Sequence, residues 1–212
     1  MQSRSSSRIP SLVGWPVGIA SAALILCACA TSATRHPHQT TVRDESGFTI
    51  NEEVQVSDEV RAEFENAVHL LRQGQYESGI ALLVKVTEQA PTVTTAHIDL
   101  AIAYSQVDDL ERAEASIKQA LELNPRHPVA HNELGILYRK TGRFSQARKS
   151  YEKALALQPD FHFARRNLAI LCDVYLGDPK CALENYELYA EAMPDDEAAA
   201  IWIADLHNRT ER

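Results

Sequence analysis

The sequence lacks the short motifs that support catalysis or phosphate binding. It contains no Gly-x-Ser-x-Gly nucleophile turn, no glycine-rich phosphate loop and no His-Glu-x-x-His helix. Metal ligands are also sparse. His36 and His38 form an isolated pair, and Pro128 keeps His127 and His131 from sharing one regular helix. We therefore expect no catalytic residue, no cofactor and no metal site.

An excess of positive charge is missing as well. The chain has 21 Lys and Arg against 29 Asp and Glu, and no basic arm, which argues against nucleic acid as a partner. The charges are spread unevenly. Residues 43–122 have 6 basic and 16 acidic side chains, residues 126–166 have 9 and 3, and residues 167–212 have 3 and 10. A basic middle thus lies between acidic ends, although solvated helix faces alone would also account for it.

Charged residues are absent from the stretch 9–34, which Arg4 and Arg8 precede. A short basic segment followed by an apolar one is typical of a secretory signal peptide. The glycines and prolines within the stretch make it a poor candidate for a long membrane-spanning helix. We therefore assign residues 1–28 to a signal peptide.

The end of this signal resembles the lipoprotein box of bacteria. That box has a leucine three residues before the cysteine that becomes acylated and a small residue immediately before it. Cys29 meets both conditions through Leu26 and Ala28, whereas Cys27 follows Leu26 directly and does not. The resemblance implies a lipid anchor on Cys29 and, with Ala30 next, a place on the periplasmic face of the outer membrane. The alternatives are cleavage with release and an uncleaved anchor.

Residues 29–57 are rich in Thr, Ser, His and Gln and show no helical or strand periodicity over a useful length. Such a composition predicts a flexible tether. A tether of this length reaches roughly 30 Å on average. It would let a folded domain move near a membrane without being pressed against it.

Four prolines mark a regular spacing in the rest of the chain. Pro91, Pro125 and Pro159 are 34 residues apart, and Pro194 follows 35 residues later. The residues between them recur in step, most completely in the third unit. Its recurring positions are His131, Leu134, Gly135, Tyr138, Gly142, Ala147, Tyr151, Ala154 and Pro159.

This pattern resembles the tetratricopeptide repeat, a helix–turn–helix unit of 34 residues. The resemblance implies an all-α fold, a right-handed superhelical solenoid of about four repeats with a C-terminal capping helix. The fourth repeat has one extra residue, which we place in its inter-helix turn. The repeat domain spans residues 58–195, with repeats at about 60–93, 94–127, 128–161 and 162–195. Residues 196–212 form the capping helix and tail, with Ile201, Trp202, Ala204 and Leu206 on its apolar side.

Two cysteines lie within the repeat domain. Cys172 and Cys181 are equally far from the centre of the turn around Leu176 and Gly177, so a helical hairpin would bring them face to face. In an oxidising compartment this pair predicts a disulfide. The alternative is two small buried apolar residues.

In tetratricopeptide arrays the first helices of successive repeats line a concave groove, and repeat positions 2, 5, 9, 12 and 13 face it. Position nine would form an aliphatic stripe of Val68, Ile102, Ile136 and Ile170. The other groove candidates are Phe64, Ile98, Asn132, Arg139, Lys140, Phe163 and Arg166. The alternative is that the aliphatic residues pack within the array. An asparagine is missing at position nine, which argues against the carboxylate clamp of chaperone-binding repeats.

The sequence therefore predicts a non-enzymatic adaptor that is anchored in the outer membrane and binds a periplasmic or outer-membrane protein segment in its groove. Lipoproteins of similar organisation include the type IV pilus pilotins, which escort a secretin subunit, and adaptors of cell-wall enzymes. The alternative is a peptidoglycan-binding protein or a regulator of cell-wall enzymes. Acidic cell-wall peptides would suit the basic centre of the groove equally well.

Overall fold

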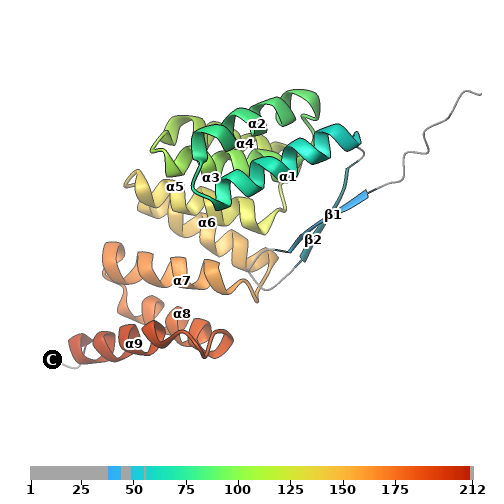
Figure 1. The fold of residues 1–212 in the computed structure, drawn as a ribbon. Helices are drawn as coiled ribbons and strands as arrows, with labels where there is room; N and C mark the ends of the chain where they lie inside the picture. The colour runs from blue at the N-terminus through green and yellow to red at the C-terminus, as the bar shows by residue number, and fades with distance from the viewer. Residues whose placement is uncertain (1–37, 44–48, 55, 211–212) are drawn as a thin grey trace, which may run out of the picture. The chain divides into compact units, whose positions relative to one another are not determined.

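The computed structural model describes residues 38–43, 49–54 and 56–210, and most of these residues are helical (Figure 1). The helices are α1 (Asp58–Arg72), α2 (Tyr76–Gln89), α3 (Thr94–Gln106), α4 (Leu110–Leu123), α5 (Pro128–Lys140), α6 (Phe144–Leu157), α7 (His162–Ile170), the π-helical turn η1 (Leu171–Leu176), α8 (Pro179–Ala192) and α9 (Glu197–Thr210). Consecutive helices pair as α1 with α2, α3 with α4, α5 with α6 and α7 with α8, and the second helix of each pair also contacts the first helix of the next. The expected array of four helical repeats with a terminal helix is confirmed.

A β-hairpin precedes the helices. Strands β1 (His38–Arg43) and β2 (Thr49–Val54) pair in antiparallel fashion, with His38 opposite Val54 and Arg43 opposite Thr49. Both strands lie within the stretch 29–57, for which the sequence predicted an unstructured tether. Each strand contains β-branched residues, which favour extended backbone, but its sequence is mostly polar and shows no clear apolar–polar alternation. The signal peptide and Cys29 lie outside the described residues.

Side chains satisfy the free backbone N–H groups at several helix starts. Ser57 Oγ accepts from the Val60 amide at 3.3 Å, and Asp109 Oδ1 accepts from the Arg112 amide at 3.1 Å. His127 Nδ1 accepts from the Ala130 amide in the same way, at 3.3 Å, so this histidine acts as a helix cap. Such caps each stabilise a helix by about 1 kcal/mol. Among the described helices, none combines the length and apolarity needed to cross a bilayer.

The prolines that set the period follow the second helix of each repeat, because a proline ring cannot continue the helical hydrogen-bond ladder. Their carbonyls have a second role. In three repeats the side chain six residues later, at the fourth position of the next helix, donates a hydrogen bond to the proline carbonyl. The pairs are His97 with Pro91 (2.9 Å), His131 with Pro125 (3.0 Å) and Arg165 with Pro159 (2.9 Å). Polar side chains thus take the place of the packing aromatic that the family pattern has there.

The turns between paired helices require left-handed backbone. Gly74, Gly142 and Gly177 have φ values of 75°, 73° and 61°, and Asp108 has φ 60° at the equivalent point of the second repeat. The left-handed residue recurs every 34 residues in the first three repeats, but Gly177 lies 35 residues after Gly142. The extra residue of the fourth repeat therefore lies in η1, at the end of the first helix, and not in the turn where the sequence placed it. A π-helical turn takes up one additional residue without breaking the helix, which explains the difference.

Helix α9 continues the repeat pattern. Its buried residues, Ala199 and Leu206, lie 35 residues after the buried Ala164 and Leu171. It therefore packs as the first helix of a further repeat, as a cap must to cover the apolar end of an array. Ile201 and Ala204 were expected on the covered side, but both are exposed, Ile201 at 67%. Trp202 and Leu206 do pack against the last core, as expected.

Candidate binding groove

The aliphatic side chains at position nine are all half-buried. Ile102 packs against the core of the first two repeats, and Ile136 and Ile170 pack against the core of the last two. Each side chain therefore supports the array with part of its surface and leaves the rest exposed on the first helices. Phe64 and Phe163 are half-buried in the same way.

Two groove candidates are buried. Ile98 is 2% exposed and Asn132 is 4% exposed, so neither reaches a partner, and their assignment to the groove is corrected. Position five of the two middle repeats is therefore buried within the array. Asn132 Oδ1 accepts a hydrogen bond of 2.9 Å from Asn167 Nδ2 in the next repeat. A buried amide pair of this kind fixes the register between two repeats.

The cation at position thirteen is already engaged. Lys140 Nζ donates to the carbonyl and to Oγ of Ser105, both at 2.9 Å, and so ties the first helices of two repeats together. Arg209 makes the corresponding link to Asp173 at 2.7 Å. Lys140 is exposed, but its ammonium group has acceptors within the array, which makes it a weaker candidate for partner binding.

Arg139 has no such acceptor. Its Nε is buried without a hydrogen-bond partner, and its guanidinium lies beside the buried Tyr151 hydroxyl. Within residues 56–210, Arg139 forms no ion pair with an acidic side chain. Its guanidinium lies 6.0 Å from the ring centroid of Tyr175. A buried donor without an acceptor is costly, so this position favours a ligand that supplies one.

Tyr151 is a neutral donor at physiological pH. Burial raises the pKa of Tyr151 to about 12, and the positive charge of Arg139 and its hydrogen bond to the hydroxyl offset this rise only in part. The Glu133 carboxylate raises the same pKa further. The phenol therefore keeps its proton at physiological pH.

Arg166 lies among aromatic rings. Its guanidinium is 5.2 Å from the centroid of Phe163 and 5.7 Å from that of Tyr189. Tyr189 Oη in turn contacts Asp196 Oδ2 at 2.5 Å. Cation–π contacts hold Arg166 in one orientation while its charge stays unpaired by any acid within residues 56–210. Tyr189 was missed from the sequence because it belongs to a second helix.

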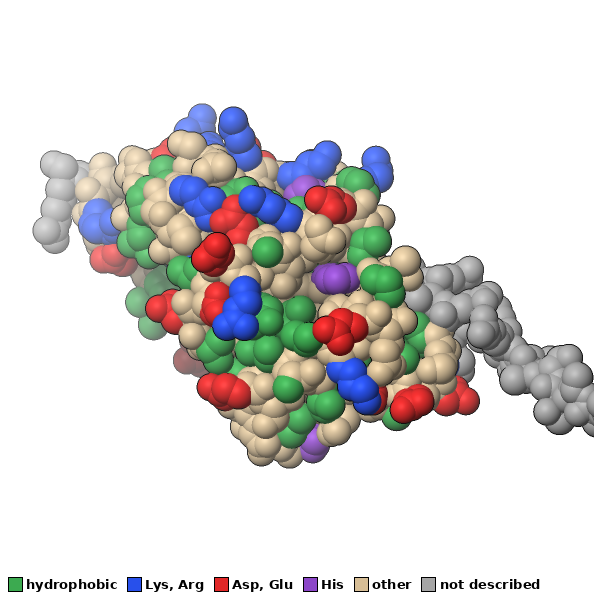
Figure 2. All heavy atoms as spheres, turned by 90° about the horizontal axis from the view of Figure 1, so that it is seen from above, with side chains coloured by type: hydrophobic (Ala, Val, Ile, Leu, Met, Phe, Trp, Pro, Cys, Tyr) green, Lys and Arg blue, Asp and Glu red, His purple; other side chains and the backbone are tan. Residues whose placement is uncertain are grey.

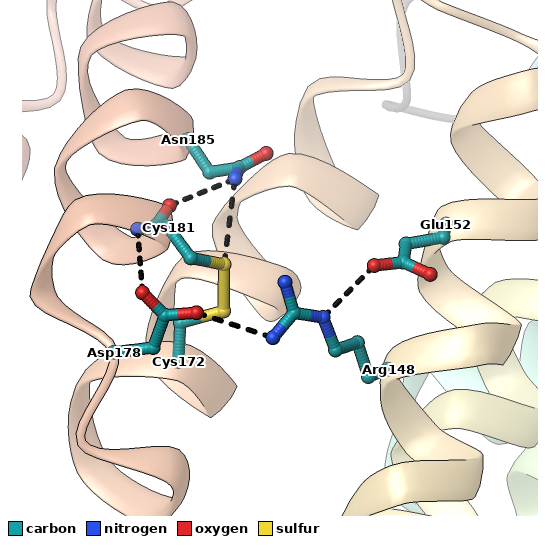
Figure 3. A network of polar contacts seen from close by, with 6 residues as sticks. All are labelled: Arg148, Glu152, Cys172, Asp178, Cys181 and Asn185. Carbon is teal, nitrogen blue, oxygen red and sulfur yellow. Dashed lines mark hydrogen bonds and ion pairs between the residues drawn. A yellow bond between two sulfur atoms is a disulfide. The ribbon is translucent and has the colours of Figure 1, made fainter.

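A disulfide joins η1 to α8. Cys172 and Cys181, the pair that the sequence indicated, have sulfurs 1.99 Å apart and Cα atoms 5.9 Å apart (Figure 3). Asp178 accepts from the Cys181 amide at 3.1 Å and from Arg148 of α6 at 3.2 Å. The two sulfurs and Asp178 lie close enough to hold one metal ion, but the disulfide uses both thiolates. The network therefore serves to fix η1 against α6 and α8.

The π-helical turn exposes two apolar side chains that sequence reasoning missed. Val174 is 65% exposed and Tyr175 is 43% exposed. The Tyr175 ring packs on Phe144 of α6, with centroids 4.8 Å apart. Their exposure follows from the position of the extra residue, which periodicity alone does not locate.

Ion pairs neutralise part of the basic middle segment. Arg143 binds Glu114 through two hydrogen bonds, of 3.1 and 2.5 Å, and Arg148 pairs with Glu152 and Asp178. On the face that Figure 2 shows, acidic and basic side chains alternate around hydrophobic patches. Charge is therefore presented locally, at particular side chains, and not as one uniform basic surface.

The family model named "Tetratricopeptide repeat" matches residues 64–128, 98–160 and 132–172, which together span half of the chain. The chain belongs to the tetratricopeptide repeat family, whose members generally act as protein-interaction modules. No curated protein matches the sequence.

Several solved structures share the fold. PilF of Pseudomonas aeruginosa is 23% identical, with a TM-score of 0.67 over 73% of this chain and 70% of its own. MamA of Desulfovibrio magneticus RS-1 is 18% identical, with a TM-score of 0.64 over 73% and 87%. The thermophilic tetratricopeptide repeat protein TTC0263 of Thermus thermophilus is 24% identical, with a TM-score of 0.63 over 70% and 81%. At these identities the likeness concerns the fold.

Proposed function

We propose that the chain is a non-enzymatic adaptor that binds a segment of another protein along the first helices of its third and fourth repeats. The observation that carries this proposal is Arg139, a half-buried cation with an unpartnered Nε on the helix that also bears Ile136. An apolar surface beside an unpaired cation suits a peptide with an apolar anchor and an acidic group.

The adaptor would be tethered to the periplasmic face of the outer membrane by a lipid on Cys29. The sequence around Cys29 supports this anchor, and the Cys172–Cys181 disulfide is suited to the oxidising periplasm. Pilus or secretin assembly is the specific candidate, because of the resemblance to pilotins and the fold shared with PilF.

A second function remains attractive because of the unpaired cations. Acidic peptides of the cell wall would satisfy Arg139 and Arg166 as well as a protein segment would. In that case the chain binds peptidoglycan or regulates cell-wall enzymes. Sedimentation of the purified chain with cell-wall sacculi separates the two functions, since only the second predicts binding that Arg139→Gln weakens.

Photo-crosslinking in the living cell tests the adaptor function. A photoreactive residue at position 136 should capture one protein, whereas the same residue at Gln119, an exposed position on the second helix of another repeat, should not. Equal capture from both positions, or none from position 136, would argue against binding along the first helices.

A further inference from the structure

The extra residue of the fourth repeat creates a surface that the other three repeats do not have. We propose that η1 and Arg139 together form a docking site for an acidic protein segment. Its carboxylate binds the Arg139 guanidinium, and an adjacent apolar side chain packs on Val174 and Tyr175. This inference rests on the proposed adaptor function and names the part of the surface and the chemistry of the partner.

The carboxylate half of the site is the half-buried Arg139 guanidinium, which forms no ion pair with an acid within residues 56–210. Its Nε has no hydrogen-bond partner, and the neighbouring Tyr151 side chain is fully buried. A carboxylate is acceptor-only and binds an arginine with charge-assisted hydrogen bonds. It would supply the anionic acceptor that Arg139 lacks.

The apolar half is held in place before a partner arrives. Val174 and Tyr175 lie on η1, which the Cys172–Cys181 disulfide joins to α8. Tyr175 packs on Phe144 and lies 6.0 Å from the Arg139 guanidinium, so the two halves adjoin. Exposed side chains on a rigid turn lose little conformational freedom on binding, which favours affinity.

Local charge selects an acidic partner over a basic one. The segment 126–166, which includes Arg139, has 9 basic and 3 acidic residues. One of the acids, Glu133, acts on Tyr151 and opposes a carboxylate from one side. A single carboxylate next to an apolar side chain therefore fits better than a run of acids. A lipid surface or a glycan would lack this pairing of one acid with one apolar group.

Selection of displayed random twelve-residue peptides on the purified full-length chain tests the proposal. The selected peptides should share an Asp or Glu, or their free C-terminus, next to an apolar residue. A synthetic peptide from the selection should bind roughly ten- to a hundredfold more weakly to Arg139→Gln, since one charge-assisted hydrogen-bonding partner is lost. Lys149→Gln removes the same charge from an exposed position of the basic segment and should change binding less than about twofold.

Two further variants address the rest of the site. Val174→Asp places an acid on a side chain that is 65% exposed, so it should fold normally and still weaken binding at least tenfold. Tyr151→Phe removes the hydroxyl of a fully buried side chain that a partner does not reach, so it should weaken binding much less than Arg139→Gln does. The matched peptide with Gln in place of Glu should bind the unmodified chain no better than it binds Arg139→Gln. Circular dichroism confirms the fold of each variant.

The outcomes separate this inference from the proposed function. Peptides that bind the chain but keep their affinity for both Arg139→Gln and Val174→Asp would overturn this site and leave the adaptor function standing. Selected peptides without acidic residues would overturn the carboxylate half. Failure to select any peptide, with Arg139-dependent binding to sacculi or to anionic vesicles, would overturn both in favour of a glycan or lipid ligand.

Discussion

Gly135 on α5 faces the ring of Tyr151 on α6 so closely that a Cβ at this glycine would lie 2.5 Å from Cε1 of the tyrosine. Tyr151 is fully buried, so its ring has little room to move away. The contact lets the two helices of the third repeat approach each other and holds the tyrosine hydroxyl beside Arg139. The contact between Gly135 and Tyr151 thus determines both how closely the two helices pack and where the tyrosine hydroxyl lies relative to Arg139.

Gly135→Ala should destabilise the domain. Overpacking a filled core costs about 1 to 3 kcal/mol, and the better helix propensity of alanine returns up to about 1 kcal/mol. We expect a net loss of about 1 to 2 kcal/mol in urea denaturation. Gly79→Ala is the comparison variant. Its Cβ would clash with Cδ2 and lie 2.9 Å from Cγ of Leu71, but this half-buried side chain is flexible and can shift, whereas the buried ring of Tyr151 cannot. Equal stability of the two variants would contradict the role of the Gly135–Tyr151 contact.

The disulfide should contribute measurably to stability. Its cysteines are nine positions apart, and the loop-entropy model assigns a bridge of this span about 2 to 3 kcal/mol. Reduction of the chain, or the Cys181→Ala variant, should lower the melting temperature. Trapping of thiols in freshly isolated protein measures the oxidation state directly. Two free thiols in trapped protein would contradict the bridge.

The Glu114–Arg143 pair should make stability depend on acid pH. The hydrogen bonds from Arg143 lower the pKa of Glu114 from 4.5 to about 2. A lowered folded-state pKa means that the stabilisation is complete above about pH 4.5 and is lost as the pH falls toward 2. Because the side chains are 33% and 20% exposed, we expect only about 1 kcal/mol.

Denaturation at pH 7 and pH 3 measures this effect. Glu114→Gln should be less stable than the unmodified chain at pH 7, and the difference should shrink at pH 3. Glu152→Gln removes an acid that is 51% exposed from its pair with Arg148 and should change stability much less. A Glu114→Gln variant with the same pH profile as the unmodified chain would refute the prediction.

Membrane attachment should depend on a single cysteine. Cys29→Ser should remove acyl labelling and move the protein out of the outer-membrane fraction, whereas Cys27→Ser should leave both unchanged. The physical reason is that one chemical group, the acylated thiol, supplies the anchoring energy. Membrane fractionation combined with acyl labelling measures the attachment. Unchanged labelling in Cys29→Ser would exclude this anchor.

The helical array could be predicted from the sequence because its causes recur along the chain. Prolines end the second helices, and small residues such as Ala147 mark close helix contacts, so both appear at a fixed spacing. The Cys172–Cys181 pairing followed from the symmetry of a helical hairpin about its turn. Each of these features is determined by residues within a single repeat.

The details of the candidate site depend on contacts between repeats and were not predictable. Asn132 is buried because Asn167 of the next repeat covers and binds it, which no local pattern indicates. Tyr151 and Tyr189 approach the groove cations from second helices, which the family pattern does not assign to the groove. The β-hairpin was missed because its two strand sequences are mostly polar and show no clear alternation of apolar and polar residues.

The π-helical turn has a consequence for comparing this chain with its family. Gly177 occupies the left-handed turn position of Gly142 but lies 35 residues later, whereas the other repeats keep a 34-residue spacing. The match to the family model ends at residue 172, just inside η1. An alignment with a fixed period loses its register there. If functional residues were assigned by such an alignment, Val174 and Tyr175 would be missed, because they lie where the fourth repeat differs from the other three.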